Sequence, residues 1–205
     1  MSFLTILPMA FVMIAGPQIL SAIVLATSEN WQRNSAAYLF GASLSITLIV
    51  TIAYLVGAGV SNQGTSDDTI YVVVLVLLLA AMANTYLKRK TSEPPKWMGK
   101  LQTASPKLSF KLGFLLLGVF PTDILTSFAV GTSLAARDGP WWNCLPFVAL
   151  TLLLLALPLL FLLAFRERAK TSLPLARDWM NTNSWIVNEI VIVFFIAITI
   201  NSIAG

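Results

Sequence analysis

Six long apolar stretches are the feature that most limits what this chain can fold into. They run roughly over residues 2–26, 36–60, 69–87, 110–135, 143–165 and 184–204. A helix rises about 1.5 Å per residue, so about 20 apolar residues cross the ~30 Å hydrocarbon core of a bilayer. Only 11% of the residues are charged, whereas soluble domains carry about 25%. We therefore expect an all-α integral membrane protein with six transmembrane helices.

The positions of the basic residues predict how these helices are oriented. Successive loops alternate between the two sides of the membrane, and twelve of the thirteen Lys and Arg residues fall in the loops at 27–35, 88–111 and 166–183. The opposite side, which receives both termini and the two remaining loops, holds only Arg137. Because basic loops stay in the cytoplasm, we expect both termini outside. No Lys or Arg precedes the first apolar stretch, so we expect a permanent helix there rather than a secretory signal.

The longest polar segment, "KRKTSEPPKWMGKLQTASPK", separates three predicted spans from three. Its three prolines oppose helix continuation, which is typical of a linker. Each half has an odd number of spans, so the second half enters the membrane in the opposite direction to the first. We expect a first three-helix repeat at 1–87, a basic cytoplasmic linker at 88–109 and an inverted second three-helix repeat at 110–205.

Each predicted repeat begins with a span that a proline interrupts near its middle. Pro17 lies in "AGPQILSAIVLAT" and Pro121 lies in "VFPTDILTSFAVGT". Paired Gly or Pro interruptions in two halves point to a transporter's binding site, although prolines also kink helices simply for packing. Small and polar residues flank both prolines. The candidate substrate-binding residues are Gly16, Pro17, Gln18, Ser21, Pro121, Thr122, Asp123 and Thr126.

Asp123 is the one carboxyl group predicted near the middle of a span. Placing an Asp at the bilayer centre costs about 2.5–3.5 kcal/mol, so such a residue indicates a functional site. Asp123 would exchange a proton during transport or hold a cationic group. Two structural alternatives stay open: a protonated Asp123 that is hydrogen-bonded to a neighbouring helix, or a cap on the half-helix that starts after Pro121.

The second predicted span adds polar residues at helical spacing. Ser43, Thr47, Thr51 and Tyr54 share one face of a helix over three turns. This stripe either lines a site together with spans one and four or packs against another helix, as hydroxylated residues often do in membranes.

The composition excludes several kinds of chemistry. The chain has no His and a single cysteine, Cys144, so it offers no disulfide, no His-based metal site and no nucleophile with its base. We expect Cys144 to be a small buried or interfacial hydrophobe, and we expect no enzyme activity, no cofactor and no bound metal. The net charge of +4 follows from the basic loops, so we expect no nucleic-acid partner.

The motifs taken in order resemble a known family. "AGPQILSAIVLATS", "NWQRNSAAYLFGASLSITLIV", "FPTDILTSFAVGTSLA" and "ARDWMNTNSWIVNEIVIVFF" are similar to segments of the glycolipid- and sulfolipid-addressing proteins of the lysine exporter superfamily. The resemblance covers essentially the whole chain. It implies a six-span fold of two inverted repeats in the plasma (inner) membrane. It also implies a role in moving lipids or other amphiphiles to or across that membrane.

The expected function is a transporter that exports a lipid-linked or amphiphilic substrate by alternating access at a midplane site between the two broken helices. The superfamily also includes exporters of amino acids and metal cations, so the fold does not name the substrate. One alternative is therefore an exporter of small cations or amino acids that uses Asp123 as its charged site. Another is a non-transporting assembly partner of a larger lipid-export complex. Membrane lipids are expected partners, and a homodimer is a further alternative to a monomer.

Overall fold

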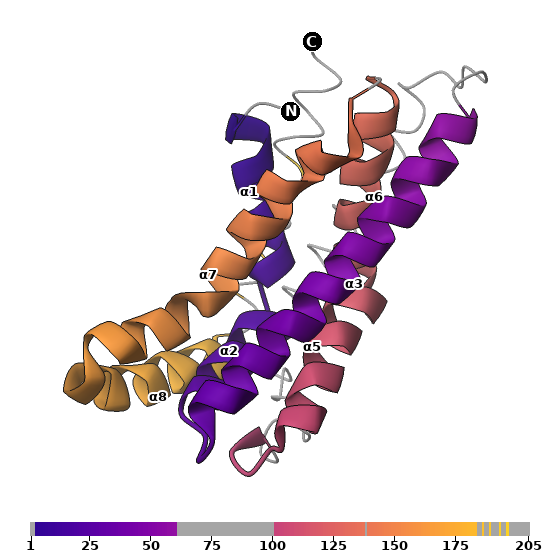
Figure 1. Cartoon of the computed structure of the whole chain (residues 1–205). Coiled ribbons are helices and arrows are strands. Elements are labelled where there is room, and N and C mark those ends of the chain that lie inside the picture. Colours follow the sequence, from indigo (N-terminus) through magenta and orange to yellow (C-terminus); the bar gives the residue numbers. More distant parts are fainter. Residues whose placement is uncertain are drawn as a thin grey trace. The chain divides into compact units, whose positions relative to one another are not determined.

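A computed structural model describes residues 3–60, 101–137 and 139–183, together with residues 186, 189, 193 and 196. Within these residues the chain is helical and has no strand. The elements are α1 (Phe3–Ile14), α2 (Pro17–Ala26), α3 (Trp31–Val60), α5 (Pro106–Val119), α6 (Pro121–Ala135), the 3-10 helix η2 (Trp141–Cys144), α7 (Leu145–Ala164) and α8 (Arg166–Thr182) (Figure 1). The third predicted span and most of the sixth lie outside the described residues.

The chain divides into two compact units, and the helices below belong to the first. The first unit contains Met1–Ser61 and Pro95–Arg177, and the second contains Asn62–Pro94 and Asp178–Gly205. The first unit therefore draws residues from both of the repeats that the sequence predicts.

Two of the described helices are long and apolar enough to cross a membrane. They cover Trp31–Gly57 and Trp141–Ala164, with mean hydropathies of 2.2 and 2.8. A third span is counted when the bent pair Pro106–Val119 and Thr122–Ala135 is taken together. The all-helical membrane architecture agrees with the sequence, and the number of spans among the described residues is two or three.

Both predicted helix breaks are confirmed. Between α1 and α2, Gly16 has a φ of 98°, a left-handed backbone conformation that only glycine adopts without strain. Between α5 and α6, Phe120 is extended and the two helix axes differ by 68°. Pro17 begins α2 and Pro121 begins α6. The first amides of a helix have no partner within it, so the missing amide proton of proline costs no hydrogen bond there.

The start of α5 differs from the predicted linker boundary at residue 109. The side chain of Ser105 accepts a hydrogen bond from the amide of Leu108, and Pro106 occupies the first helical turn. Pro106 therefore starts a helix, because proline is favoured at the first position of a helix, where it also prevents a helix from continuing across it. Lys107 and Lys111 consequently lie on the first turns of α5 rather than in a loop.

Each long helix packs against the broken helix of the opposite half. From the first half, α3 lies along α5 and α6, while α7 from the second half lies against α1 and α2 (Figure 1). The residues at the centre of α3 that face other helices are buried: Tyr38, Ala42, Ile46, Val50 and Ala53. Cys144, at the end of η2, is buried and forms no disulfide, as expected for a small hydrophobe.

Glycines allow α3 to approach α5 and α6 closely. A Cβ atom on Gly113 would lie 2.1 Å from the carbonyl oxygen of Tyr38, and one on Gly41 would lie 2.2 Å from the carbonyl oxygen of Phe110. Gly131 of α6 meets the carbonyl oxygen of Val50 in the same way, at 2.5 Å. Close backbone approach at small residues is typical of helix packing in membranes, where burial of apolar side chains provides no driving force.

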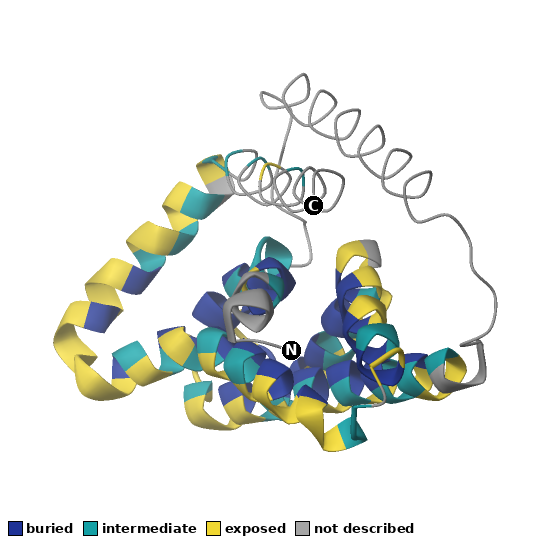
Figure 2. Ribbon diagram, turned by 90° about the horizontal axis from the view of Figure 1, so that it is seen from above, coloured by how far each residue is buried: buried dark blue, intermediate teal, exposed yellow. Residues whose placement is uncertain are grey.

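The outer surface of this unit is apolar. Buried positions gather where helices face one another, and exposed positions follow their outer sides (Figure 2). On α3 the exposed side chains are large and hydrophobic: Phe40, Leu44, Leu48, Ile52 and Leu55. Such a surface suits contact with acyl chains, because hydrocarbon does not penalise apolar side chains as water does.

Candidate functional site

The two helix breaks meet through one hydrogen bond. The side-chain amide of Gln18 on α2 donates from Nε2 to Oδ2 of Asp123 on α6, over 2.6 Å. Both side chains are buried, with exposed fractions of 1% for Gln18 and 0% for Asp123. A bond between a polar side chain of each half, directly after each proline, brings together two residues that the sequence predicted as a site.

Asp123 occupies the first turn of α6 but does not cap it. The N-cap residue is Phe120, and no side chain caps this helix. The backbone amide of Asp123 instead donates to the carbonyl oxygen of Phe120 over 3.1 Å. A carboxylate in this turn also interacts favourably with the positive end of the helix dipole. Of the two structural alternatives for Asp123, the geometry matches a hydrogen bond to a neighbouring helix.

Tyr38 is a third member of the buried cluster, and the sequence analysis missed it. Its hydroxyl group donates to the backbone carbonyl oxygen of Gln18 over 2.9 Å, and the residue is 1% exposed. A tyrosine near the start of a membrane helix is typical of the aromatic belt at the interface. Its hydroxyl group could have indicated the cluster, because that group needs a hydrogen-bond partner wherever the ring is buried.

The remaining predicted residues satisfy their hydroxyl groups locally. Ser21 donates to the carbonyl oxygen of Pro17 over 2.6 Å, and Thr126 donates to that of Thr122 over 2.7 Å. Thr122 itself is exposed, and its hydroxyl group lies 3.4 Å from Oδ1 of Asp123. Ser21 and Thr126 therefore lie beside the Gln18–Asp123 pair without joining it.

One atom of the pair is without a partner among the residues that the structure describes. Oε1 of Gln18 is buried and accepts no hydrogen bond there. Buried polar atoms are satisfied in most native structures, so an exception calls for a physical reason. This acceptor and the Asp123 carboxyl group are buried oxygen acceptors suited to a hydrogen-bond donor.

The predicted stripe on α3 faces elsewhere. Its four residues are half-buried, and the described bonds of Thr51 lead away from the pair. Thr51 donates to the carbonyl oxygen of Thr47 over 2.6 Å and accepts from the indole of Trp141 over 2.9 Å. The residue that α3 contributes to the cluster is Tyr38, which lies on a different face of the helix from the stripe.

Two apolar helices of spanning length and a polar contact between two proline-broken helices define a helical membrane protein with a buried polar site at discontinuous helices. The chain belongs to the SfLAP family, because the family model of Sap, sulfolipid-1-addressing protein, matches residues 6–203. This match confirms the resemblance seen in the sequence. Comparison with the curated proteins and with the solved structures gave no match.

Proposed function

We propose that this protein is a transporter that exports a lipid-linked or amphiphilic substrate across the plasma membrane. The family match over residues 6–203 supports the lipid part of the proposal, since the family description concerns the addressing of a sulfolipid. The contact between Gln18 and Asp123 supports the transport part. Polar groups at facing helix breaks are the arrangement that many transporters use at their central site.

The hydrogen bond between Gln18 and Asp123 holds the two halves together and does not itself bind acyl chains. This bond is called the lock below. The pair is enclosed and polar, whereas a lipid-binding cavity is apolar and opens toward the membrane. In the closed arrangement the bond holds α2 against α6. Neutralisation of Asp123 by a proton or a cation weakens a charge-assisted hydrogen bond and favours separation of the two helices.

The packing of the long helices gives this lock a mechanical consequence. Because α3 packs most extensively against α5 and α6, while α7 packs most extensively against α1, a movement at the lock would carry the long helix of the opposite half with it. Alternating access then consists of a rocking movement between two interlocked bodies: α3 with α5 and α6, and α7 with α1 and α2.

The second candidate function is export of small cations or amino acids with Asp123 as the charged site. The observation that favours it is on Gln18, which is bonded to Asp123 through its Nε2 and whose Oε1 is buried without a partner among the described residues. An ammonium group or a small cation would satisfy both acceptors.

Export assays in cells separate these functions. Cells without the protein are complemented with the wild type, with Asp123→Asn, or with Glu29→Gln, which removes an exposed carboxylate as a matched control. We expect Asp123→Asn to lower the amount of surface-extractable amphiphilic lipid about tenfold, since loss of the carboxyl charge removes the switchable bond. Glu29→Gln should export like the wild type.

Two results contradict the first proposal. Unchanged surface lipid together with Asp123-dependent efflux of amino acids or cations assigns the protein to the second function. Unchanged export of every class, with and without the protein, contradicts transport and favours a role as an assembly partner of a lipid exporter.

A further inference from the structure

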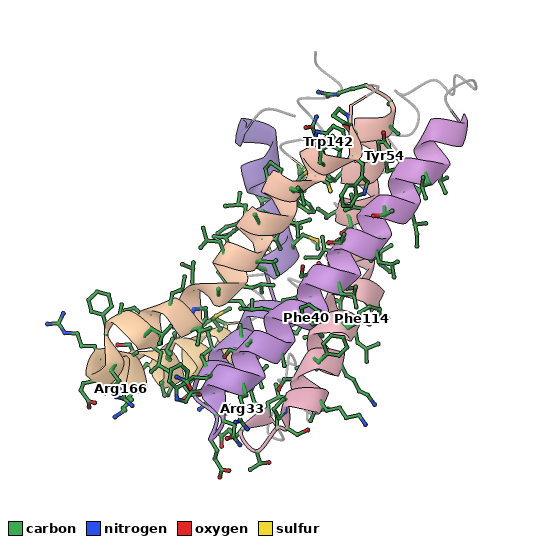
Figure 3. The ribbon with its side chains drawn as sticks, in the orientation of Figure 1. Arg33, Phe40, Tyr54, Phe114, Trp142 and Arg166 are labelled. Carbon is green, nitrogen blue, oxygen red and sulfur yellow. The ribbon has the colours of Figure 1, made fainter. Side chains whose placement is uncertain are left out.

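A cavity of about 450 Å³ lies in the first unit, away from the Gln18–Asp123 pair. It is formed by the turn between α2 and α3, by Gln102, by the last turns of α7 and by α8 up to Arg177. Figure 3 shows Arg33 and Arg166 at this end of the unit, and Trp142 and Tyr54 at the other. The distribution of basic residues predicts that this end faces the cytoplasm.

The walls of the cavity carry a concentration of positive charge. Arg166, Lys170 and Arg177, which come from α8, all line it. Lys170 forms a salt bridge with Glu167, with 3.0 Å between nitrogen and oxygen, and both side chains are more than half exposed. An exposed pair of this kind contributes little, and the ammonium group keeps further donors for another ligand.

Apolar residues complete the lining. Ala26 from α2, Leu162 from α7 and Pro174 from α8 line the same cavity, and Trp31 adds an aromatic ring at the start of α3. A basic wall next to an apolar one suits an amphiphile, whose charged group and hydrocarbon need different surroundings. The volume lies within the range of about 300–1,000 Å³ that is typical of small-molecule sites.

We propose that this cavity binds the sulfate or phosphate ester oxyanion of an anionic amphiphile, with Arg166 and Lys170 as the principal cationic contacts. Arginine recognises such oxyanions through a planar fork of donors, and lysine recognises them as a point charge. Basic pockets between helices on the cytoplasmic side are a recurring form of lipid-headgroup recognition. The inference rests on the proposed function in one respect: it makes this cavity the place where a substrate headgroup is held before export.

Binding to the purified full-length protein in neutral detergent tests the site by native mass spectrometry. The probes are dioleoyl phosphatidic acid, dioleoylglycerol, which has the same acyl chains and no phosphate, and free inorganic phosphate and sulfate. We expect the double variant Arg166→Gln/Lys170→Gln to bind phosphatidic acid about tenfold more weakly, since two charged contacts are lost. Its binding of dioleoylglycerol should not change.

Arg168→Gln is the matched control, because Arg168 is an exposed residue of the same helix that does not line the cavity. It should bind phosphatidic acid like the wild type, and Arg166→Lys should keep most of the affinity. Equal affinity of the wild type and the double variant overturns the site. An equal loss in Arg168→Gln also overturns it, since it would mean diffuse surface attraction. Lys170→Gln provides a milder variant if the double variant unfolds.

The remaining probes identify the source of the oxyanion. Displacement of phosphatidic acid by free phosphate or sulfate supports an oxyanion site that accepts a headgroup. If the free ions bind with the same dependence on Arg166 and Lys170 but phosphatidic acid does not bind, the site takes a free ion, and the headgroup proposal is overturned. Because the measurement needs no transport, binding without lipid export contradicts the proposed function only. Lipid export with unchanged oxyanion binding in the double variant contradicts the site only.

Discussion

At the scale of single residues, the free energy of one buried carboxyl group decides how the two broken helices pack. An Asp near the bilayer centre costs about 2.5–3.5 kcal/mol, and a hydrogen bond to a charged group returns about 1.5–3 kcal/mol. The bond from Gln18 therefore offsets most of the cost of burying Asp123. This near balance is also what makes the contact easy to open when the carboxyl group is neutralised.

A double-mutant cycle checks that balance. Gln18→Leu leaves the Asp123 carboxyl group without its donor, and Asp123→Leu leaves the Gln18 amide without its acceptor. Each variant should therefore lower the free energy of unfolding. The double variant should lose less than the sum of both, with a coupling of about 1.5–3 kcal/mol, because no polar group is then left unpaired. The measurement is unfolding of the purified protein in detergent.

Gln32→Leu gives the control for this cycle, since Gln32 is exposed near the start of α3. Its effect should add to that of Asp123→Leu within a few tenths of a kcal/mol. Additive losses for Gln18→Leu and Asp123→Leu would mean that the bond contributes nothing to stability.

At the scale of the helices, glycines rather than large side chains set the distance between α3 and its neighbours. Gly41 on α3 and Gly113 on α5 both lie at the contact between these two helices. A Cβ on either glycine would overlap a backbone carbonyl oxygen of the other helix. Backbone atoms cannot turn away as a flexible side chain can. The position of Tyr38, and with it the bond to Gln18, depends on this close contact.

Gly113→Ala should therefore lower the free energy of unfolding by about 1–3 kcal/mol, the usual cost of overfilling a packed interface. The result is informative because alanine favours helix over glycine by about 1 kcal/mol, which acts in the opposite direction. Thermal unfolding in detergent measures the difference. Gly139→Ala is the control, since its Cβ would come no closer than 3.3 Å to another atom. Equal stability of both variants would show that α5 moves aside at no cost.

At the scale of the whole molecule, the exchange of partners between halves is the main feature. Each long helix packs on the broken helix of the other half, so neither half is complete as a separate bundle among the described helices. The two three-helix repeats and their inverted orientation remain predictions, and topology measurements can check the orientation.

Labelling of introduced cysteines checks the orientation. In a Cys144→Ala background, Ser105→Cys lies just before α5 at the basic end, and Arg137→Cys lies just after α6. A membrane-impermeant maleimide should label Arg137→Cys in intact cells, and Ser105→Cys only after permeabilisation, because basic loops stay in the cytoplasm. The reverse pattern would contradict the predicted orientation, and labelling of both positions in intact cells would contradict a single crossing between them.

Local signals in the sequence were sufficient for the helical membrane class and for the breaks at Pro17 and Pro121. Each of these depends on hydrophobic length or on backbone chemistry, which neighbouring residues reveal. The start of α5 was missed because the same proline can end a helix or begin one, and the Ser105 cap decides which.

Only the folded chain could bring Tyr38 to the carbonyl oxygen of Gln18, turn the stripe of Ser43, Thr47, Thr51 and Tyr54 away from the pair, and form a cavity beside Arg166 and Lys170. These features depend on how helices rotate and pack against one another. In a membrane, helix packing depends on close contacts at small residues such as Gly41 and Gly113. A helix that is hydrophobic on most sides gives little information about which side faces another helix.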